Sequence, residues 1–188
     1  ARAIERLDTP ASPLRSRHAT FGIDLSGQSL VQPEFADFVR TTLKSAALPA
    51  EQLVFEFTES AAISDMPAAQ RFIERVGALG VQFALDDFGT GFSSLAYLKS
   101  LAVSALKIDG CFVRDLLTDS RSEGVIRAVL QIAAQLGLDT VAEYVETGAI
   151  ADRLRSLGVT YGQGYAFGAP VPLDTVLGSM MSPYLPTG

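Results

Sequence analysis

The sequence predicts an α/β fold in which a parallel sheet is covered by helices. Short apolar runs alternate with longer stretches whose apolar residues recur at helical spacing, and the links between them are short. Successive apolar runs also end in polar side chains, as expected where strands lead into functional loops. The chain has 188 residues, 48% of them hydrophobic, so we expect residues 1–188 to form one domain with a substantial core.

The first half of the chain predicts three strands and two complete helices. The expected strands cover residues 21–25, 53–57 and 81–86. The expected helices cover residues 33–47, where apolar side chains share one face, and 65–79, which Asp65 caps and Gly80 ends. Residues 1–7 resemble the end of a helix, and residues 8–18 a loop.

The second half predicts three more strands and three more helices. The expected strands cover residues 105–108, 140–145 and 159–161. A short helix capped by Ser93 or Ser94 is expected to end at Lys99. Two longer helices are expected, from Ser120 or Ser122 to Leu136 before Gly137, and from Thr147 to Leu157 before Gly158.

Polar side chains are expected to project from the carboxyl ends of these strands. Side chains alternate between the two faces of a strand, so Lys107 and Asp109 share one face while Leu106 and Ile108 share the other. The same reasoning selects one polar group per strand, namely Asp24, Glu56, Asp86, Lys107, Glu143 and Gln163. In a (β/α)8 barrel these groups would converge on one mouth, where such barrels build active sites. An open doubly wound sheet is the alternative, and it would spread them along an edge.

The stretch from Phe83 to Leu95 combines a buried strand with a polar loop. Its apolar run ends in Asp86 and Asp87, which are followed by the turn Gly89-Thr90-Gly91. Two carboxylates at the exit of a buried strand are costly unless a cation neutralises them. A solvated polar strand end is the simpler alternative.

The charge balance favours a small ligand over a polymer. The formal net charge is −6 and no segment carries a recurring stripe of lysine and arginine, so we expect no polymeric nucleic acid as a partner. Oxygen ligands favour magnesium, manganese or calcium over zinc. Two such ions clamped by carboxylates are a known solution for cleaving phosphodiesters, and the adjacent Asp86 and Asp87 suit a bridging role.

Cysteine content and hydropathy predict a cytoplasmic protein. Cys111 is the single cysteine, which rules out an internal disulfide, and His18 is the single histidine. No apolar run approaches the roughly 20 residues that span a bilayer, and no signal peptide opens the chain. We therefore expect no membrane contact by this segment.

Several motifs resemble one family. The stretch Phe83 to Leu95 is similar to the signature loop of EAL domains, the bacterial phosphodiesterases of cyclic di-GMP. Further matches follow in order at residues 55–60, 106–109, 142–147 and 163–165. They extend from about residue 20 to about residue 170 and so cover most of the chain. The resemblance implies a TIM-like (β/α)8 barrel, of which about six strands lie in this chain.

The resemblance also implies roles for the polar residues. Glu56 and Asp86 would hold a first Mg²⁺ or Mn²⁺ ion together with Asp24, and a second ion would lie among Asp86, Asp87 and Glu143. The resemblance further implies that Lys107 orients or deprotonates the attacking water, with Asp109 nearby, and that Gln163 contacts phosphate or water. The alternative for Lys107 and Asp109 is an internal ion pair on one strand face.

A further set of residues is implied to stabilise the signature loop. Glu59 would steady this loop, which includes Gly89, Thr90 and Gly91 and couples the site to a homodimer contact. The alternative for Glu59 is a solvated carboxylate at the start of a helix, where acidic side chains are favoured.

The chain departs from the family pattern at several positions. No Glu-Ala-Leu tripeptide, the namesake motif, precedes Asp24, and Asp24 replaces the usual asparagine. Tyr144 replaces a glycine and is expected to pack away from the mouth, whereas Phe92 for tyrosine removes only a hydroxyl. We therefore expect an N-terminally incomplete domain that is inactive alone and has unpaired strand edges.

Three functions fit these observations. The first is a phosphodiesterase that hydrolyses cyclic di-GMP to linear pGpG by a two-metal mechanism in bacterial signalling. The second is a catalytically inactive receptor for cyclic di-GMP, and the third an unrelated metal-dependent barrel enzyme. The family resemblance also predicts attached sensory or GGDEF-type domains in the full-length protein.

Overall fold

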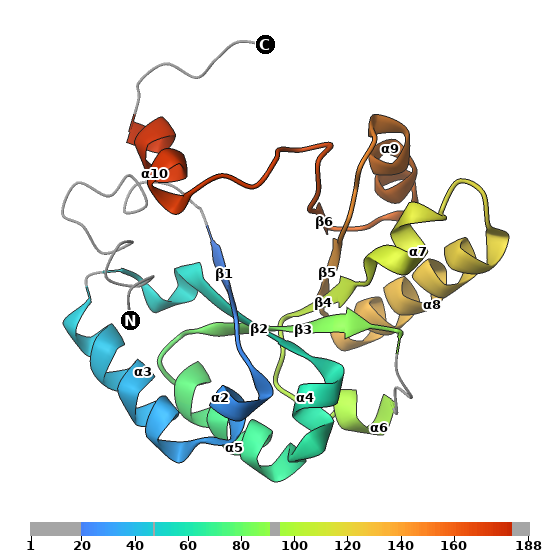
Figure 1. Cartoon of the computed structure of the whole chain (residues 1–188). Helices are drawn as coiled ribbons and strands as arrows, with labels where there is room; N and C mark the ends of the chain where they lie inside the picture. Colours follow the sequence, from blue (N-terminus) through green and yellow to red (C-terminus); the bar gives the residue numbers. More distant parts are fainter. Residues whose placement is uncertain (1–19, 47, 91–94, 182–188) are drawn as a thin grey trace.

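A computed structural model describes residues 20–46, 48–90 and 95–181 of the chain (Figure 1). Six parallel strands form one sheet in the order of the sequence. They are β1 (Phe21–Asp24), β2 (Leu53–Thr58), β3 (Gln82–Phe88), β4 (Ala105–Ile108), β5 (Asp139–Ala142) and β6 (Tyr161–Gly162). The number and approximate position of the expected strands are thereby confirmed.

The strand order distinguishes the two expected architectures. Crossover connections between parallel strands are right-handed, so a sheet whose order never reverses keeps its helices on one face. A doubly wound sheet reverses its order and carries helices on both faces. The sheet here runs from β1 to β6 without reversal and curves with the helices on its outer side (Figure 1). The chain is therefore a half-barrel, and the doubly wound alternative is wrong.

The expected long helices are present, although α5 ends at Gly77, before the expected stop at Gly80. They are α3 (Pro33–Ser45), α5 (Met66–Gly77), α8 (Ser120–Leu136) and α9 (Gly148–Leu157). The side chains of Asp65 and Thr147 accept backbone N–H groups at the starts of α5 and α9. Gly137 and Gly158 adopt the left-handed conformation that ends α8 and α9.

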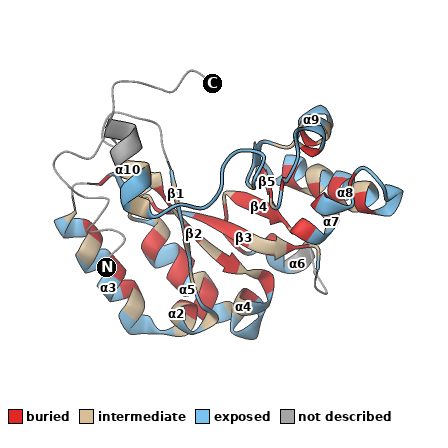
Figure 2. Cartoon of the chain, turned by 45° about the horizontal axis from the view of Figure 1, so that its top comes forward, coloured by how far each residue is buried: buried red, intermediate tan, exposed pale blue. Residues whose placement is uncertain are grey.

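Other elements differ from the expectation. Short helices too brief to show a helical period appear as α2 (Gly27–Val31), α4 (Glu59–Ser64), α6 (Leu95–Leu98), α7 (Gly110–Arg114) and the 3₁₀ turn η2 (Ala50–Gln52). Of these, sequence predicted only α6. A further helix, α10 (Leu173–Met181), lies beside β1 in Figures 1 and 2. The expected strand over residues 140–145 is too long, because β5 ends at Ala142 and Tyr144 turns the backbone to a φ of +52°.

The core lies between the sheet and its helices. The side chains that face outward from β2, β3 and β4 are almost fully buried, and they are Phe55, Phe57, Phe83, Leu85, Leu106 and Ile108. Six phenylalanine rings form a connected cluster with neighbouring centroids about 6 Å apart, namely Phe35, Phe38, Phe55, Phe57, Phe72 and Phe83. Figure 2 shows this burial along the central strands and the inner faces of the helices. The opposite, concave face of the sheet is left for polar groups.

Some expectations lie outside the described residues. They are the helix end at residues 1–7, the loop at 8–18, the capping role of Ser93 or Ser94, and Gly91. Within the described ranges, no helix is both long and apolar enough to cross a membrane.

Candidate metal centre

A buried lysine lies at the centre of the concave face. Lys107 on β4 is 4% exposed, and its Nζ lies 2.6 Å from Glu56 Oε2, 3.0 Å from Asp86 Oδ2 and 2.8 Å from Glu143 Oε1. Burying an ammonium group away from water is unfavourable unless partners of opposite charge replace the water. Three carboxylates from three other segments supply those partners, so Lys107 ties β2, β3 and the end of β5 together.

These contacts determine the charge of Lys107. Burial lowers the pKa of its ammonium, but the hydrogen bonds to Glu143 and Glu56 outweigh burial, and the pKa lies above its ordinary value. Burial also raises the pKa of the Glu143 carboxyl, although its bond to Lys107 opposes this. In the absence of other cations Lys107 is a charged donor and not a base.

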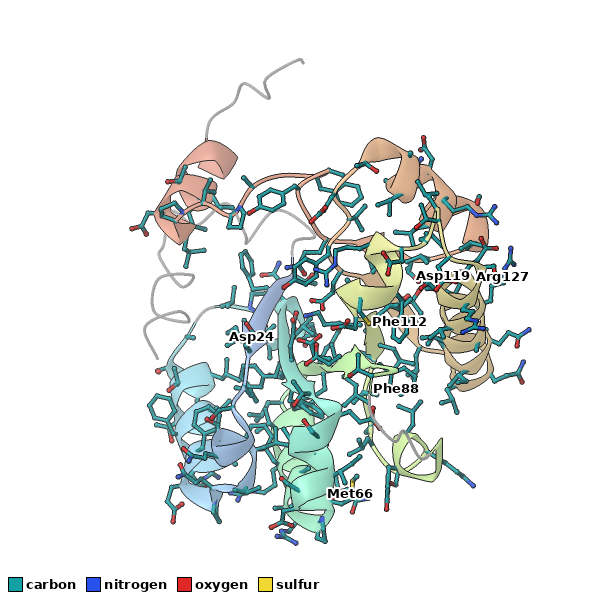
Figure 3. The ribbon with its side chains drawn as sticks, turned by 45° about the vertical axis from the view of Figure 1, so that its right-hand side comes forward. Asp24, Met66, Phe88, Phe112, Asp119 and Arg127 are labelled. Atoms are coloured by element: carbon teal, nitrogen blue, oxygen red, sulfur yellow. The ribbon has the colours of Figure 1, made fainter. Side chains whose placement is uncertain are left out.

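Two overlapping groups of carboxylates surround the lysine. Asp24, Glu56 and Asp86 can each place an oxygen within 4.8 Å of the other two, and so can Asp86, Asp87 and Glu143. Asp86 belongs to both groups. Figure 3 shows Asp24 on the β1 side of the sheet and Phe112 on the α7 side, with several side-chain oxygen atoms drawn between them. The two groups are those that the family resemblance implied, while their role as metal ligands stays a prediction.

A bulge in β3 directs two adjacent aspartates into the same site. Leu85 pairs with Leu106 and Phe88 pairs with Ile108, so the two residues Asp86 and Asp87 lie opposite Lys107 alone. Strict alternation would turn their side chains to opposite faces of the sheet. The extra residue, together with a φ of +54° at Asp87, breaks the alternation. Sequence reasoning missed this bulge, for which the glycine-rich turn just downstream is the only signal.

Asp109 extends the acidic cluster without contacting Lys107. Its carboxylate accepts the backbone N–H of Cys111 at 2.7 Å and so caps α7. Burial, the negative charges of Asp86 and Asp109, and the polar contact with Asp109 raise the pKa of Asp87. Burial opposes ionisation of Asp109, but the bonds from Cys111 keep its pKa below the usual value. The alternative of a Lys107–Asp109 ion pair on one strand face is therefore wrong.

The described start of the signature loop shares a cavity with the first turn of α4. Glu59, in the first turn of α4, is 9% exposed, so the solvated alternative for it is wrong. Glu59, Asp87 and Thr90 line one cavity, and Thr90 donates its hydroxyl to the Asp87 carbonyl at 2.9 Å. Gly89 has a φ of +100°, a conformation that side chains disfavour. The loop-stabilising role of these residues stays a prediction.

Gln163 lies at the edge of the sheet. Its backbone N–H donates to the Ala142 carbonyl at 2.8 Å, and its carbonyl accepts from Val145 at 3.0 Å. Its side chain is exposed. Tyr144 is also 52% exposed, and its ring packs under the Arg114 guanidinium. That it points away from the mouth stays a prediction.

The donors in this centre fit hard divalent cations. The two groups contain five carboxylates and no nitrogen or sulfur donor, which is the ligand chemistry of Mg²⁺, Mn²⁺ and Ca²⁺. One ammonium group cannot balance five carboxylates, so the cluster retains excess negative charge. The raised pKa values of Asp87 and Glu143 reflect this crowding together with burial. The residues present therefore fit a centre for more than one cation.

Fold and site together define a barrel-type α/β protein with an acidic centre at the carboxyl ends of its strands. The family model described as "EAL domain" matches residues 2–170, and the chain therefore belongs to the EAL domain family. It is 38% identical over 151 residues to the cyclic di-GMP phosphodiesterase PdeB of Shewanella oneidensis, and 40% identical over 157 residues to PdeF of Escherichia coli. These matches cover 80% and 84% of this chain.

A solved structure shows the same architecture. The PaMucR phosphodiesterase, in complex with c-di-GMP, superimposes with a TM-score of 0.83 at 36% identity, covering 94% of this chain and 74% of that one. The two curated relatives are much longer than the shared part, since the matches span 18% of PdeB and 21% of PdeF. The resemblance inferred from the motifs is confirmed.

Proposed function

We propose that this chain is part of a phosphodiesterase domain that hydrolyses cyclic di-GMP to linear pGpG. The observation that carries the proposal is the pair of carboxylate groups that share Asp86 around a buried lysine. Relatives named as cyclic di-GMP phosphodiesterases support the choice of substrate. In the reaction, water adds to one phosphorus, one P–O bond breaks, and the product carries a new phosphate terminus and a new hydroxyl.

We propose a separate role for each polar residue of the centre. Asp24, Glu56 and Asp86 would hold one Mg²⁺ or Mn²⁺ ion, and Asp86, Asp87 and Glu143 a second one. When bound, such ions neutralise the phosphodiester charge and activate water. Lys107 would donate a hydrogen bond to that water, with Asp109 beside the second group, and Gln163 would contact phosphate.

The wider context of the domain is also proposed. Relatives several times longer than the shared part, one of them named as a bifunctional diguanylate cyclase and phosphodiesterase, support attached sensory or GGDEF-type domains. We further propose a cytoplasmic homodimer in which the signature loop, with Glu59, Gly89, Thr90 and Gly91, links the site to the dimer contact. Light scattering on the purified chain tests the dimer.

The test of function is a product assay. The chain, and a second version extended upstream by about 70 residues or roughly two βα units, are incubated with cyclic di-GMP and saturating Mn²⁺. We expect pGpG from the longer version and none from it after Asp86→Asn. Asp152→Asn is the matched control, because it removes the same charge from an exposed ion pair on α9.

The outcomes separate the functional classes. Turnover that survives Asp86→Asn would contradict the proposed site. Tight binding of cyclic di-GMP with no turnover by either version would replace the proposal with the receptor function. Turnover by the short chain would show that it needs no upstream residue.

A further inference from the structure

Beside the acidic centre, one aromatic residue has a backbone conformation that is rare for residues other than glycine. Tyr144 directly follows Glu143 and has a φ of +52°. Among the described residues other than glycine, only Asp87 shares a positive φ. Aspartate tolerates this region, whereas a bulky aromatic residue enters it only when its surroundings enforce it. The contacts of Tyr144 show what enforces it.

The first contact is a close approach to the backbone of α7. A Cβ atom placed on Gly110 would lie 2.6 Å from Cγ and 2.8 Å from Cβ of Tyr144, closer than real side chains pack. Both atoms lie near the root of the tyrosine, so rotation of its ring cannot relieve the overlap. Gly110 does not have a positive φ, and its lack of a side chain therefore serves to leave space.

The second contact comes from the other end of the same short helix. The Arg114 guanidinium lies over the Tyr144 ring, 4.8 Å from its centroid, in cation–π geometry. Gly110 and Arg114 are the first and last residues of α7. The ring is therefore held along the length of that helix, while 52% of the residue remains exposed.

These contacts join two segments that carry site residues. Helix α7 follows β4 and is capped by Asp109, and Tyr144 belongs to the segment after β5 that carries Glu143. Glu143 Oε1 lies 2.8 Å from Lys107 Nζ. We propose that Tyr144 is a positioning residue that clamps the segment after β5 onto α7 and so holds Glu143 against Lys107, an inference that rests on the proposed function for the role of Glu143.

The test uses four variants of the chain with Mn²⁺ as the probe. Tyr144→Gly removes both the strain and the clamp, Tyr144→Phe keeps the ring, Gly110→Ala fills the space, and the fourth variant combines Gly110→Ala with Tyr144→Gly. We expect Mn²⁺ affinity to fall about tenfold in Tyr144→Gly and in Gly110→Ala, as for residues that orient a ligand, and to stay near wild type in Tyr144→Phe. The double variant should bind like Tyr144→Gly alone.

Stability is measured in parallel to separate positioning from packing. Tyr144→Gly relieves an unfavourable conformation, so its melting temperature should not fall in step with its Mn²⁺ affinity. If Gly110→Ala lowers Mn²⁺ affinity as much in the Tyr144→Gly background as in the wild type, the proposed clamp does not exist. A melting temperature that falls while Mn²⁺ affinity is kept would also overturn the inference, since the contact would then serve packing alone.

A second readout does not depend on metal. The ammonium protons of Lys107 are followed by ¹⁵N–¹H NMR in metal-free protein. We expect Tyr144→Gly to shift this signal and speed its exchange with water, and Tyr144→Phe to leave both unchanged. An unchanged signal in Tyr144→Gly overturns the inference. A wild type that binds no Mn²⁺ but shows this response would contradict the proposed function and support the positioning role.

Discussion

At the scale of single residues, the acidic centre depends on two glycines as well as on its charged side chains. A Cβ atom on Gly22 of β1 would collide with the Glu56 carboxylate. Glu56 therefore reaches Lys107 across a space that only glycine leaves open. Gly110 does the same for Tyr144. In both pairs the glycine acts by its size, because neither glycine has a positive φ.

Gly22→Ala is expected to weaken Mn²⁺ binding with little loss of stability. The new methyl group would meet the flexible end of Glu56, which can swing aside at small cost but then leaves its place in the site. We expect Mn²⁺ affinity to fall by about tenfold, as for other changes that disturb a ligand's orientation. Isothermal titration measures this.

The matched control is Gly124→Ala in α8, where an added Cβ meets nothing within 4 Å. That change should stabilise the helix by about 0.5–1 kcal/mol and leave Mn²⁺ binding intact. Equal Mn²⁺ affinities for Gly22→Ala and wild type would contradict the position assigned to Glu56.

The single thiol is expected to react slowly below pH 10. Partial burial and the neighbouring Asp109 carboxylate raise the pKa of Cys111 to about 11, although the residue is exposed. The folded state thus favours the neutral thiol, and the stability gained from it is lost as the pH rises toward the folded pKa. Alkylation by iodoacetamide should accelerate about tenfold per pH unit up to pH 10 without a plateau, because only the thiolate reacts.

Asp109→Asn should lower the pKa of Cys111 and speed its alkylation at pH 8, because the amide carries no negative charge. Protein unfolded in urea supplies the reference rate. A native pKa indistinguishable from the unfolded one would count against the packing of Cys111 beside Asp109.

At the scale of elements, the helices show which signals sequence carries. The caps at Asp65 and Thr147 and the stops at Gly137 and Gly158 were predictable, because each depends on one side chain and its immediate backbone. The bulge at Asp86 and Asp87 was not, since it depends on how β3 pairs with β4 across the sheet. Alternation alone selected Glu56, Asp86 and Lys107 for one face, but it could not place Asp87 there, because Asp87 joins that face only through the bulge.

Asp65→Ala is expected to destabilise the domain by about 1 kcal/mol. The Asp65 side chain accepts the N–H of Ala68 at 3.0 Å, a donor that has no partner within the helix. Asp65→Ser retains a hydrogen-bond acceptor, so it should lose much less stability than Asp65→Ala. Urea denaturation measures both variants, and Mn²⁺ affinity should not change in either. Equal losses for serine and alanine would show that the cap contributes no stability.

At the scale of the whole molecule, the fold separates stability from chemistry. The apolar side chains of the sheet point outward toward the helices, whereas its concave face collects Lys107 and the carboxylates at the strand ends. Parallel strands in sequential order bring together residues up to 119 positions apart, from Asp24 to Glu143, because their carboxyl ends meet at one edge. The proposed function requires this edge to bind two divalent cations that share Asp86.

Anomalous diffraction at the manganese edge, from crystals grown with Mn²⁺, tests this metal centre most directly. We expect two peaks about 3.5–4 Å apart, one within reach of Asp24, Glu56 and Asp86 and the other within reach of Asp86, Asp87 and Glu143. Crystals of Asp86→Asn should lose at least one peak. Two peaks elsewhere on the molecule, or none beside Lys107 at saturating Mn²⁺, would show that this edge of the sheet is not a two-cation centre.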